Sequence, residues 1–245
     1  MGRKTSALAL QSWCLRNLKE NPQLIAELKG LGLGRVELCG VHADFADEAS
    51  FAGVVELFKA KGMQIPSIGV QGMRGAAAEE EKFFRFARMA GAGHISVSFA
   101  PELFPDGFGY AEALAERHQV KLGIHNHGGR HWLGSAEMLE AVFKRTGPSV
   151  GLMLDTGWAM QAGEDPIAMA ARFKDRLFGL HIKDFAFDRA GKPEDVVPGT
   201  GNLDLAKLFG KLREIEFQGM LVVEYEGDPA NLPACVEAVS KAMGN

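Results

Sequence analysis

The sequence predicts one (β/α)8 barrel, a TIM barrel, that forms a single domain over residues 1–245. Short apolar runs rich in Val, Ile, Leu and Met alternate with longer segments of helical period, which is the pattern of repeated βα units around a parallel sheet. Eight such runs follow one another at even spacing, and barrels of about this length remain undivided. No linker, charge block or low-complexity segment interrupts the series.

In chain order, the apolar runs predict strands at Ala7–Trp13, Arg35–Leu38, Gln64–Ile68, His94–Ser98, Lys121–His125, Gly151–Asp155, Leu177–Ile182 and Met220–Tyr225. Helical periodicity between them predicts helices at Gln23–Leu31, Glu48–Lys61, Ala77–Ala90, Tyr110–His118, Glu137–Arg145 and Leu205–Glu214. Asn21 followed by Pro22 is typical of a helix start, and Gly32, Gly62 and Gly91 are typical of helix ends.

The connection after the first strand distinguishes a closed barrel from an open dinucleotide-binding sheet. An open sheet would need a glycine-rich loop there, so that pyrophosphate could meet the N-terminus of the next helix. The segment SWCLRNLKEN contains no glycine. The sequence therefore favours the barrel.

Charge and cysteine content restrict the partners and the compartment. A formal net charge of −4 argues against nucleic acid as a partner. Cys14, Cys39 and Cys235 are too few and too scattered for a disulfide framework or a cysteine zinc cluster, so a reducing cytoplasm is expected. The opening MGRKTSALALQSWCLR is rejected as a secretory signal because Gln11 and Ser12 interrupt its apolar run. No apolar stretch is long enough to span a membrane, and a homo-oligomer is left open.

Polar residues close each of the last four predicted strands, within HNHGG, LDTGW, HIKDF and VEYEGD. Parallel barrel strands end at one mouth, so His125, Asp155, His181 and Glu224 are expected to converge and bind a divalent metal ion. Two imidazoles and two carboxylates suit Mn, Fe, Co or Zn better than Mg. In the alternative without metal, Asp155 caps the following helix while His181 pairs with Glu224.

These motifs, together with GLGRVEL and PGTGNLD, resemble the sugar phosphate isomerase/epimerase family with the xylose isomerase-like barrel. That family also includes keto-sugar 3-epimerases, inosose dehydratases and a branch of apurinic endonucleases. The resemblance implies that Asp155, His181 and Glu224 are metal ligands on the sixth, seventh and eighth strands. The fifth strand departs from the family, because His125-Asn126-His127 stands where many members have Glu-Asn-His. A proton exchange between two glutamates therefore cannot simply be transferred to this chain.

The expected chemistry is proton abstraction next to a carbonyl, which a chelated dication would acidify. The resemblance implies Glu224 as the base, with His127, His125 and Glu226 as alternatives. Lys183 follows His181 by two residues and should share its side of the strand, where it would steady an enolate oxygen or form an interior ion pair.

Four residues are candidates for binding the substrate. Trp13 and Trp158 would stack on the C–H face of a sugar, or would simply fill the top of the barrel. Glu37 would bind a substrate hydroxyl or pair with Arg16. Arg130 would contact a phosphate or remain an exposed cation. The long segment FAFDRAGKPEDVVPGTGNLD is expected to be either a lid or an ordered excursion.

The sequence thus predicts a metal-dependent isomerase or epimerase that acts on a small sugar-like molecule, namely a keto-sugar, a sugar phosphate or a related polyol. A lyase of the inosose-dehydratase type is the first alternative, and a non-catalytic sugar-binding barrel is the second. A phosphodiesterase that cleaves abasic DNA is disfavoured, because His42 and Glu102 are the only obvious additional ligands on the early strands.

Overall fold

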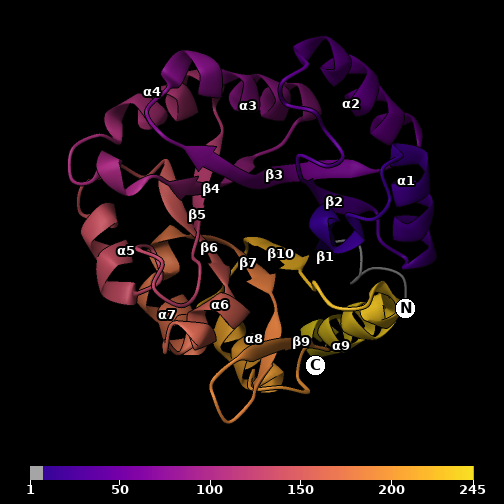
Figure 1. The fold of residues 1–245 in the computed structure, drawn as a ribbon, viewed down its shortest axis with the longest axis vertical. Coiled ribbons are helices and arrows are strands. Elements are labelled where there is room, and N and C mark those ends of the chain that lie inside the picture. Colours follow the sequence, from indigo (N-terminus) through magenta and orange to yellow (C-terminus); the bar gives the residue numbers. More distant parts are fainter. Residues whose placement is uncertain (1–7, 245) are drawn as a thin grey trace.

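The computed structural model describes residues 8–244 and has eight parallel strands in a closed barrel with the order β1-β10-β7-β6-β5-β4-β3-β2 (Figure 1). The strands are β1 (Leu8–Gln11), β2 (Arg35–Leu38), β3 (Gln64–Met73), β4 (His94–Phe99), β5 (Lys121–His125), β6 (Val150–Asp155), β7 (Leu177–Ile182) and β10 (Met220–Val223). The predicted fold class is confirmed, because the eight parallel strands close into a barrel with helices between them in the chain.

Helices form a ring around the barrel (Figure 1). The α-helices are α1 (Asn21–Gly30), α2 (Phe51–Ala60), α3 (Ala77–Ala90), α4 (Gly109–His118), α5 (Ala136–Phe143), α6 (Thr156–Gln161), α7 (Pro166–Arg172), α8 (Leu205–Glu214) and α9 (Leu232–Gly244). In α8, Leu205, Leu208, Phe209 and Leu212 are buried at positions i, i+3, i+4 and i+7, so one stripe faces the barrel. None of the helices between residues 8 and 244 combines the length and apolarity that crossing a bilayer requires.

Element boundaries differ from the predicted ones where the chain turns at the mouth. The first strand ends at Gln11 and a 3₁₀ helix, η2 (Ser12–Leu15), follows and carries Trp13. Ala7, the predicted start of that strand, and the basic residues of the supposed signal lie outside the described residues. Strand β3 continues to Met73 beyond a register shift. The helix predicted from Glu48 is a 3₁₀ turn, η3 (Glu48–Ser50), followed by α2.

The long connection after β7 is ordered as an antiparallel hairpin of β8 (Asp184–Phe187) and β9 (Pro193–Val196). The loop that follows is held by the buried carboxylate of Asp184, which accepts four backbone N–H groups at 2.8–3.0 Å, from Gly199, Gly201, Asn202 and Leu203. The segment is therefore an ordered excursion, and the expectation that it acts as a lid stays a prediction.

Met153 fills the barrel interior beneath the mouth. A Cβ on Gly179 would lie 2.6 Å from Met153 Sδ, and a Cβ on Gly123 would lie 3.0 Å from Met153 Cβ. These strand glycines therefore leave the room that the methionine needs. Side chains two residues further along a strand point the same way, so Asp155 and His181 lie directly above this layer.

Candidate metal centre and cavity

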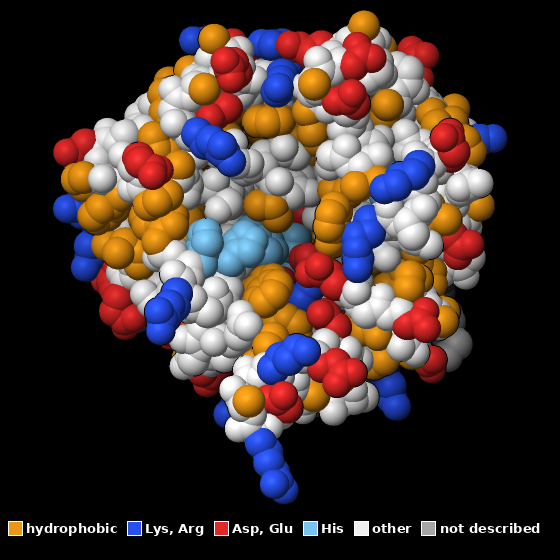
Figure 2. All heavy atoms as spheres, in the orientation of Figure 1, with side chains coloured by type: hydrophobic (Ala, Val, Ile, Leu, Met, Phe, Trp, Pro, Cys, Tyr) orange, Lys and Arg blue, Asp and Glu red, His pale blue; other side chains and the backbone are white. Residues whose placement is uncertain are grey.

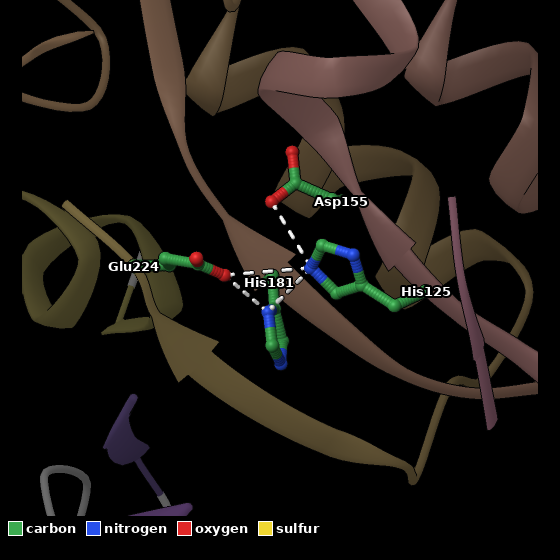
Figure 3. A group of neighbouring side chains, drawn as sticks. All are labelled: His125, Asp155, His181 and Glu224. Atoms are coloured by element: carbon green, nitrogen blue, oxygen red, sulfur yellow. Dashed lines mark hydrogen bonds and ion pairs between the residues drawn. The ribbon is translucent and has the colours of Figure 1, made fainter. Parts of the chain in front are cut away.

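Four side chains from four strands meet at the barrel mouth, and Figure 3 shows them pointing toward one another. His125 closes β5, Asp155 closes β6, His181 lies on β7, and Glu224 directly follows β10. One donor atom from each lies within 4.8 Å of the other three. The structure thus brings together the quartet that the strand ends predicted.

Two of the distances between donor atoms match those around a bound cation, and the two contacts that His181 makes are closer. His125 Nε2 lies 3.0 Å from His181 Nδ1, 3.5 Å from Asp155 Oδ2 and 3.5 Å from Glu224 Oε2. Ligands placed about 2.0–2.2 Å from one tetrahedral metal ion are roughly 3.3–3.6 Å apart. Asp155 Oδ2 is also buried and has no hydrogen-bond partner among the described residues. A buried carboxylate oxygen of this kind needs a partner, and a cation would supply it.

Opposite charges shift the pKa values of His181 and Glu224 in opposite directions. Burial alone would lower the pKa of His181, but Glu37 and Glu224 outweigh it and hold that pKa well above its usual value. Burial also opposes ionisation of Glu224, yet Lys183 and His181 hold the pKa of its carboxyl well below the ordinary range. His181 Nδ1 and Glu224 Oε2 accordingly form a close ion pair.

Asp155 has two functions because its two oxygens face different ways. Oδ1 accepts the backbone N–H of Trp158 at 2.7 Å and caps α6, while Oδ2 faces the quartet. Asn126 holds the backbone of Asp155 from the neighbouring strand, since its amide accepts from Asp155 N at 2.8 Å and donates to Asp155 O at 3.0 Å. The helix cap that sequence reasoning set against metal binding is real, and it leaves one oxygen available.

A cavity of about 480 Å³ opens above the quartet. Figure 2 shows histidine side chains at the centre of this hollowed face, with acidic and hydrophobic side chains beside them. Trp13, Val70 and Trp158 supply apolar wall, and Trp13 and Val70 remain 40% and 37% exposed. Both tryptophans therefore lie where a substrate could contact them, although Trp13 arrives on η2 rather than at a strand end.

His127 also lines the cavity and is neutral near pH 7. Burial, aided by the positive charge of His125, lowers the pKa of His127 to about 3. Its Nδ1 is buried and has no hydrogen-bond partner among the described residues. A neutral imidazole in this position can exchange hydrogen bonds with a substrate hydroxyl.

Lys183 lies at the side of the cavity in a group of carboxylates. Its Nζ lies 2.5 Å from Glu226 Oε1, 3.4 Å from Asp195 Oδ1 and 3.9 Å from Glu224 Oε1. Burial opposes the charge on this fully buried side chain, but the carboxylates, with Glu224 first, hold the pKa of Lys183 above its usual value. Lys183 is thus a cation that is ion-paired inside the barrel. This arrangement is one of the two predictions made for it from the sequence.

Glu37 and Arg130 do not line the cavity, and Arg130 remains an exposed cation, which was one of the two predictions for it. Glu37 does not pair with Arg16; that alternative is wrong, because Arg16 donates to the backbone oxygens of Trp13 and Glu226. Glu37 is instead completely buried beside His181. Arg130 is exposed and is not among the residues that line the cavity.

The additional ligands that a zinc cluster for DNA cleavage would need do not join the quartet. His42 Nε2 lies 2.8 Å from the backbone oxygen of Leu18, and Glu102 is exposed. Among the described residues, the quartet is the one group of His, Cys, Asp and Glu side chains with metal-ligand spacing.

Sequence reasoning missed the polar residues that hold the site from outside it. Gln11 interrupts the first apolar run, and its Nε2 donates to Glu37 Oε1 at 2.7 Å. Asp195 in the hairpin accepts the backbone N–H of Glu226 at 3.2 Å, besides facing Lys183. A single polar residue within a buried strand was the available signal for Gln11, but no local pattern marks Asp195.

Comparison with known proteins identifies a family and several relatives. The model of the xylose isomerase-like TIM barrel family matches residues 25–242. An inosose dehydratase from Geobacillus kaustophilus is 32% identical over 144 residues, which are 53% of this chain and 46% of that protein. The chain thus spans about half the length of the curated relatives it matches.

Two solved structures share the fold over almost the whole chain. The IolI protein with a bound zinc atom superposes with a TM-score of 0.75 at 17% identity, covering 96% of both chains. A D-tagatose 3-epimerase-like protein superposes with a TM-score of 0.78 at 14% identity, covering 97% of both chains. At these identities the similarity shows the barrel architecture alone.

Proposed function

The chain belongs to the xylose isomerase-like TIM barrel family, and from this premise we propose that it is a metal-dependent lyase that removes water from a keto-polyol of the inosose kind. The observation that carries the proposal is the convergence of His125, Asp155, His181 and Glu224 beneath an open cavity. The named dehydratase activity of a relative that is 32% identical over half of this chain supports the lyase over the isomerase or epimerase.

The quartet would hold the metal ion, and its two nitrogen and two carboxylate donors favour Mn, Fe, Co or Zn over Mg. A dication held there supplies a Lewis acid that polarises the substrate carbonyl and stabilises the negative charge that develops on it. The two carboxylates of Asp155 and Glu224 balance its charge, so the loaded quartet is neutral.

The residues of this chain would move the protons. Glu224 takes the proton from the carbon next to the carbonyl, as its family position implies. The C–O bond on the adjacent carbon then breaks with its electron pair on the oxygen, which takes up the proton from Glu224 and departs as water, so that Glu224 is again ionised. His127, whose neutral imidazole lines the cavity, hydrogen-bonds the departing hydroxyl. Lys183, whose Nζ lies 3.9 Å from Glu224 Oε1, keeps Glu224 ionised before the transfer.

The distribution of carboxylates favours elimination over epimerisation. An epimerase must protonate and deprotonate the same carbon from two faces, for which the keto-sugar 3-epimerases of this family use two glutamates. Here the fifth-strand position is His125, and one oxygen of Asp155 is occupied by the α6 cap. Glu224 is therefore the one quartet carboxylate placed for proton transfer, which suffices for removal of water.

The walls of the cavity suit a ring-shaped polyol. Trp13 and Trp158 offer apolar faces for C–H groups, while His127 and Glu226 offer hydrogen-bonding groups for hydroxyls. A small sugar-like substrate presents both kinds of surface. We propose no role for Arg130 in binding it, because Arg130 does not line the cavity.

The test is an assay of purified protein loaded with Mn²⁺, Co²⁺ or Zn²⁺ against a panel of keto-inositols and keto-sugars in D₂O. Dehydration is followed by the ultraviolet absorbance of the conjugated product, and deuterium incorporation is followed by NMR. We expect a dehydrated product that chelator treatment abolishes and that metal restores.

A pair of matched variants separates the metal from general folding. Asp155→Asn removes a ligand charge but keeps an oxygen for the α6 cap, so it should abolish turnover. Asp204→Asn alters an equivalent cap on α8, where the carboxylate accepts from Lys207 N at 2.9 Å, and should leave turnover unchanged. Deuterated epimer without dehydration would support the isomerase or epimerase instead. Sugar binding without metal or turnover would support a binding barrel.

A further inference from the structure

Glu37 is a carboxylate sealed inside the barrel beneath the quartet. It lies on β2, is completely buried, and has polar side chains from three other strands around it. Gln11 Nε2 donates to its Oε1 at 2.7 Å, and Ser96 Oγ donates to its Oε2 at 2.9 Å. His181 Nε2 lies 2.8 Å from the same Oε1. A buried carboxylate is costly, so this arrangement calls for a function.

The two nitrogens of His181 face opposite partners. Nε2 faces Glu37, while Nδ1 faces His125 Nε2 at 3.0 Å and also Glu224. Both nitrogens thus face carboxylate oxygens. A cation bound in the quartet would need the lone pair of Nδ1, which leaves Nε2 to carry the proton and to face the acceptor oxygen of Glu37.

We propose that Glu37 is a positioning residue that fixes the tautomer and the ring orientation of His181 for a cation in the quartet. The inference rests on the proposed metal site and extends it to the early strands, none of which provides a member of the quartet. Carboxylates that accept the second N–H of a ligating histidine orient the ring and raise its basicity.

The neighbours of Glu37 explain how a side chain from β2 can hold a ligand on β7. Gln11 comes from β1 and Ser96 from β4, while Glu37 itself lies on β2. These three early strands together fix the carboxylate in place in the barrel interior. Gln11 is itself held, because its Nε2 also donates to the backbone oxygen of Gly69 at 3.2 Å. The carboxylate therefore cannot turn away from His181 without losing paired, buried hydrogen bonds.

The test compares metal binding by the wild type, Glu37→Gln and Glu37→Ala. Dissociation constants for Zn²⁺ are measured by competition with a chromogenic chelator, and the absorption spectrum of the Co²⁺ form reports ligand geometry. Loss of such a partner weakens metal binding by about 10–100-fold. We expect Glu37→Ala to show that loss, and Glu37→Gln, which keeps an acceptor oxygen, to recover part of it.

Glu80→Gln is the matched control for removing a buried negative charge. Glu80 is 5% exposed and accepts from Arg74 N at 2.6 Å and Tyr110 Oη at 2.7 Å, on the side of the barrel formed by α3 and α4. It should lower stability without changing the Zn²⁺ dissociation constant or the Co²⁺ spectrum. If Glu37→Ala does not fold, Ser96→Ala replaces it, and a several-fold weaker dissociation constant is expected.

The Zn²⁺ and Co²⁺ measurements distinguish failure of the inference about Glu37 from failure of the proposed function. If the wild type binds Zn²⁺ and the Glu37 variants bind it within twofold as tightly with an unchanged Co²⁺ spectrum, Glu37 is only structural and the inference fails alone. If the wild type binds neither Zn²⁺ nor Co²⁺, the proposed function fails and the inference fails with it.

Discussion

Lys183 and Lys211 allow a controlled test of what burial does to an ion pair. Each has its Nζ 2.5 Å from a glutamate oxygen, Glu226 Oε1 for Lys183 and Glu214 Oε2 for Lys211. The side chain of Lys183 is 0% exposed and that of Lys211 is 28% exposed. The two pairs have the same separation, so a difference between Lys183→Met and Lys211→Met measures the surroundings.

The structure predicts a large difference. Solvent screens an exposed pair, so Lys211→Met should cost about 0–1 kcal/mol of unfolding free energy. Lys183→Met leaves Glu226, Asp195 and Glu224 without their shared cation, and breaking a buried pair costs about 3–5 kcal/mol. Glu226 is 30% exposed and regains some water, which favours the lower end, about 3 kcal/mol. For a chain of this size that corresponds to a fall in Tm of about 6–12 °C.

Urea unfolding followed by circular dichroism, with both variants and the wild type in one buffer, gives the two free-energy losses. Methionine is close to lysine in length and fills the same space, so cavity formation contributes little. Equal losses for the two variants would refute the reasoning, because the charge cluster would then be no more than a screened surface pair.

Three further outcomes are expected. Asn126→Ala leaves the backbone N–H of Asp155 buried and unpaired, so it should cost about 1–3 kcal/mol in urea unfolding; a loss below about 0.5 kcal/mol would contradict this. Burial and, to a smaller extent, the charge of Lys121 lower the pKa of His94 to about 4. As pH falls below 6.5, His94 is therefore protonated in the unfolded chain before it is protonated in the folded chain. Stability should therefore drop between pH 6.5 and 4 by up to about 3 kcal/mol, and the drop should be smaller in His94→Asn; parallel curves for the two proteins would exclude it. Asp184→Ala removes the acceptor of four loop N–H groups, so limited proteolysis should cut residues 197–203 faster than in the wild type; an unchanged rate would show that other contacts hold the loop.

The late half of the candidate site could be predicted because barrel geometry decides it. Parallel strands end at one mouth, so polar residues at successive strand ends converge whatever their separation in sequence. The convergence of the quartet could therefore be predicted without knowing how the helices pack. Its members are His125, Asp155, His181 and Glu224. The lengths of β3 and of η2 depend on contacts at the mouth, so local periodicity placed those boundaries less well.

The early half could not be predicted because its partners are distant and its side chains are hidden. Glu37 lies 144 positions before His181 in sequence, and within RVELCG it looks like an isolated charge beside apolar neighbours. The prediction that Glu37 pairs with Arg16 relied on nearness in the sequence. In the closed barrel, Glu37 instead faces His181 across the interior. Likewise, Asp195 faces Lys183 only because β9 folds back on β8.

Asp155 shows why a site residue and a structural residue need not be alternatives. The sequence LDTGW supports a helix start as well as a metal ligand, and each interpretation uses one carboxylate oxygen. The cap holds Oδ1 against Trp158 N, which fixes the rotation of the carboxylate and aims Oδ2 at His125. Glu37 acts on His181 in the same sense from the opposite side of the barrel. In this chain the local hydrogen bonds that define secondary structure and the barrel interior also orient the groups proposed to bind the ion, so preorganisation and fold stability depend on the same contacts.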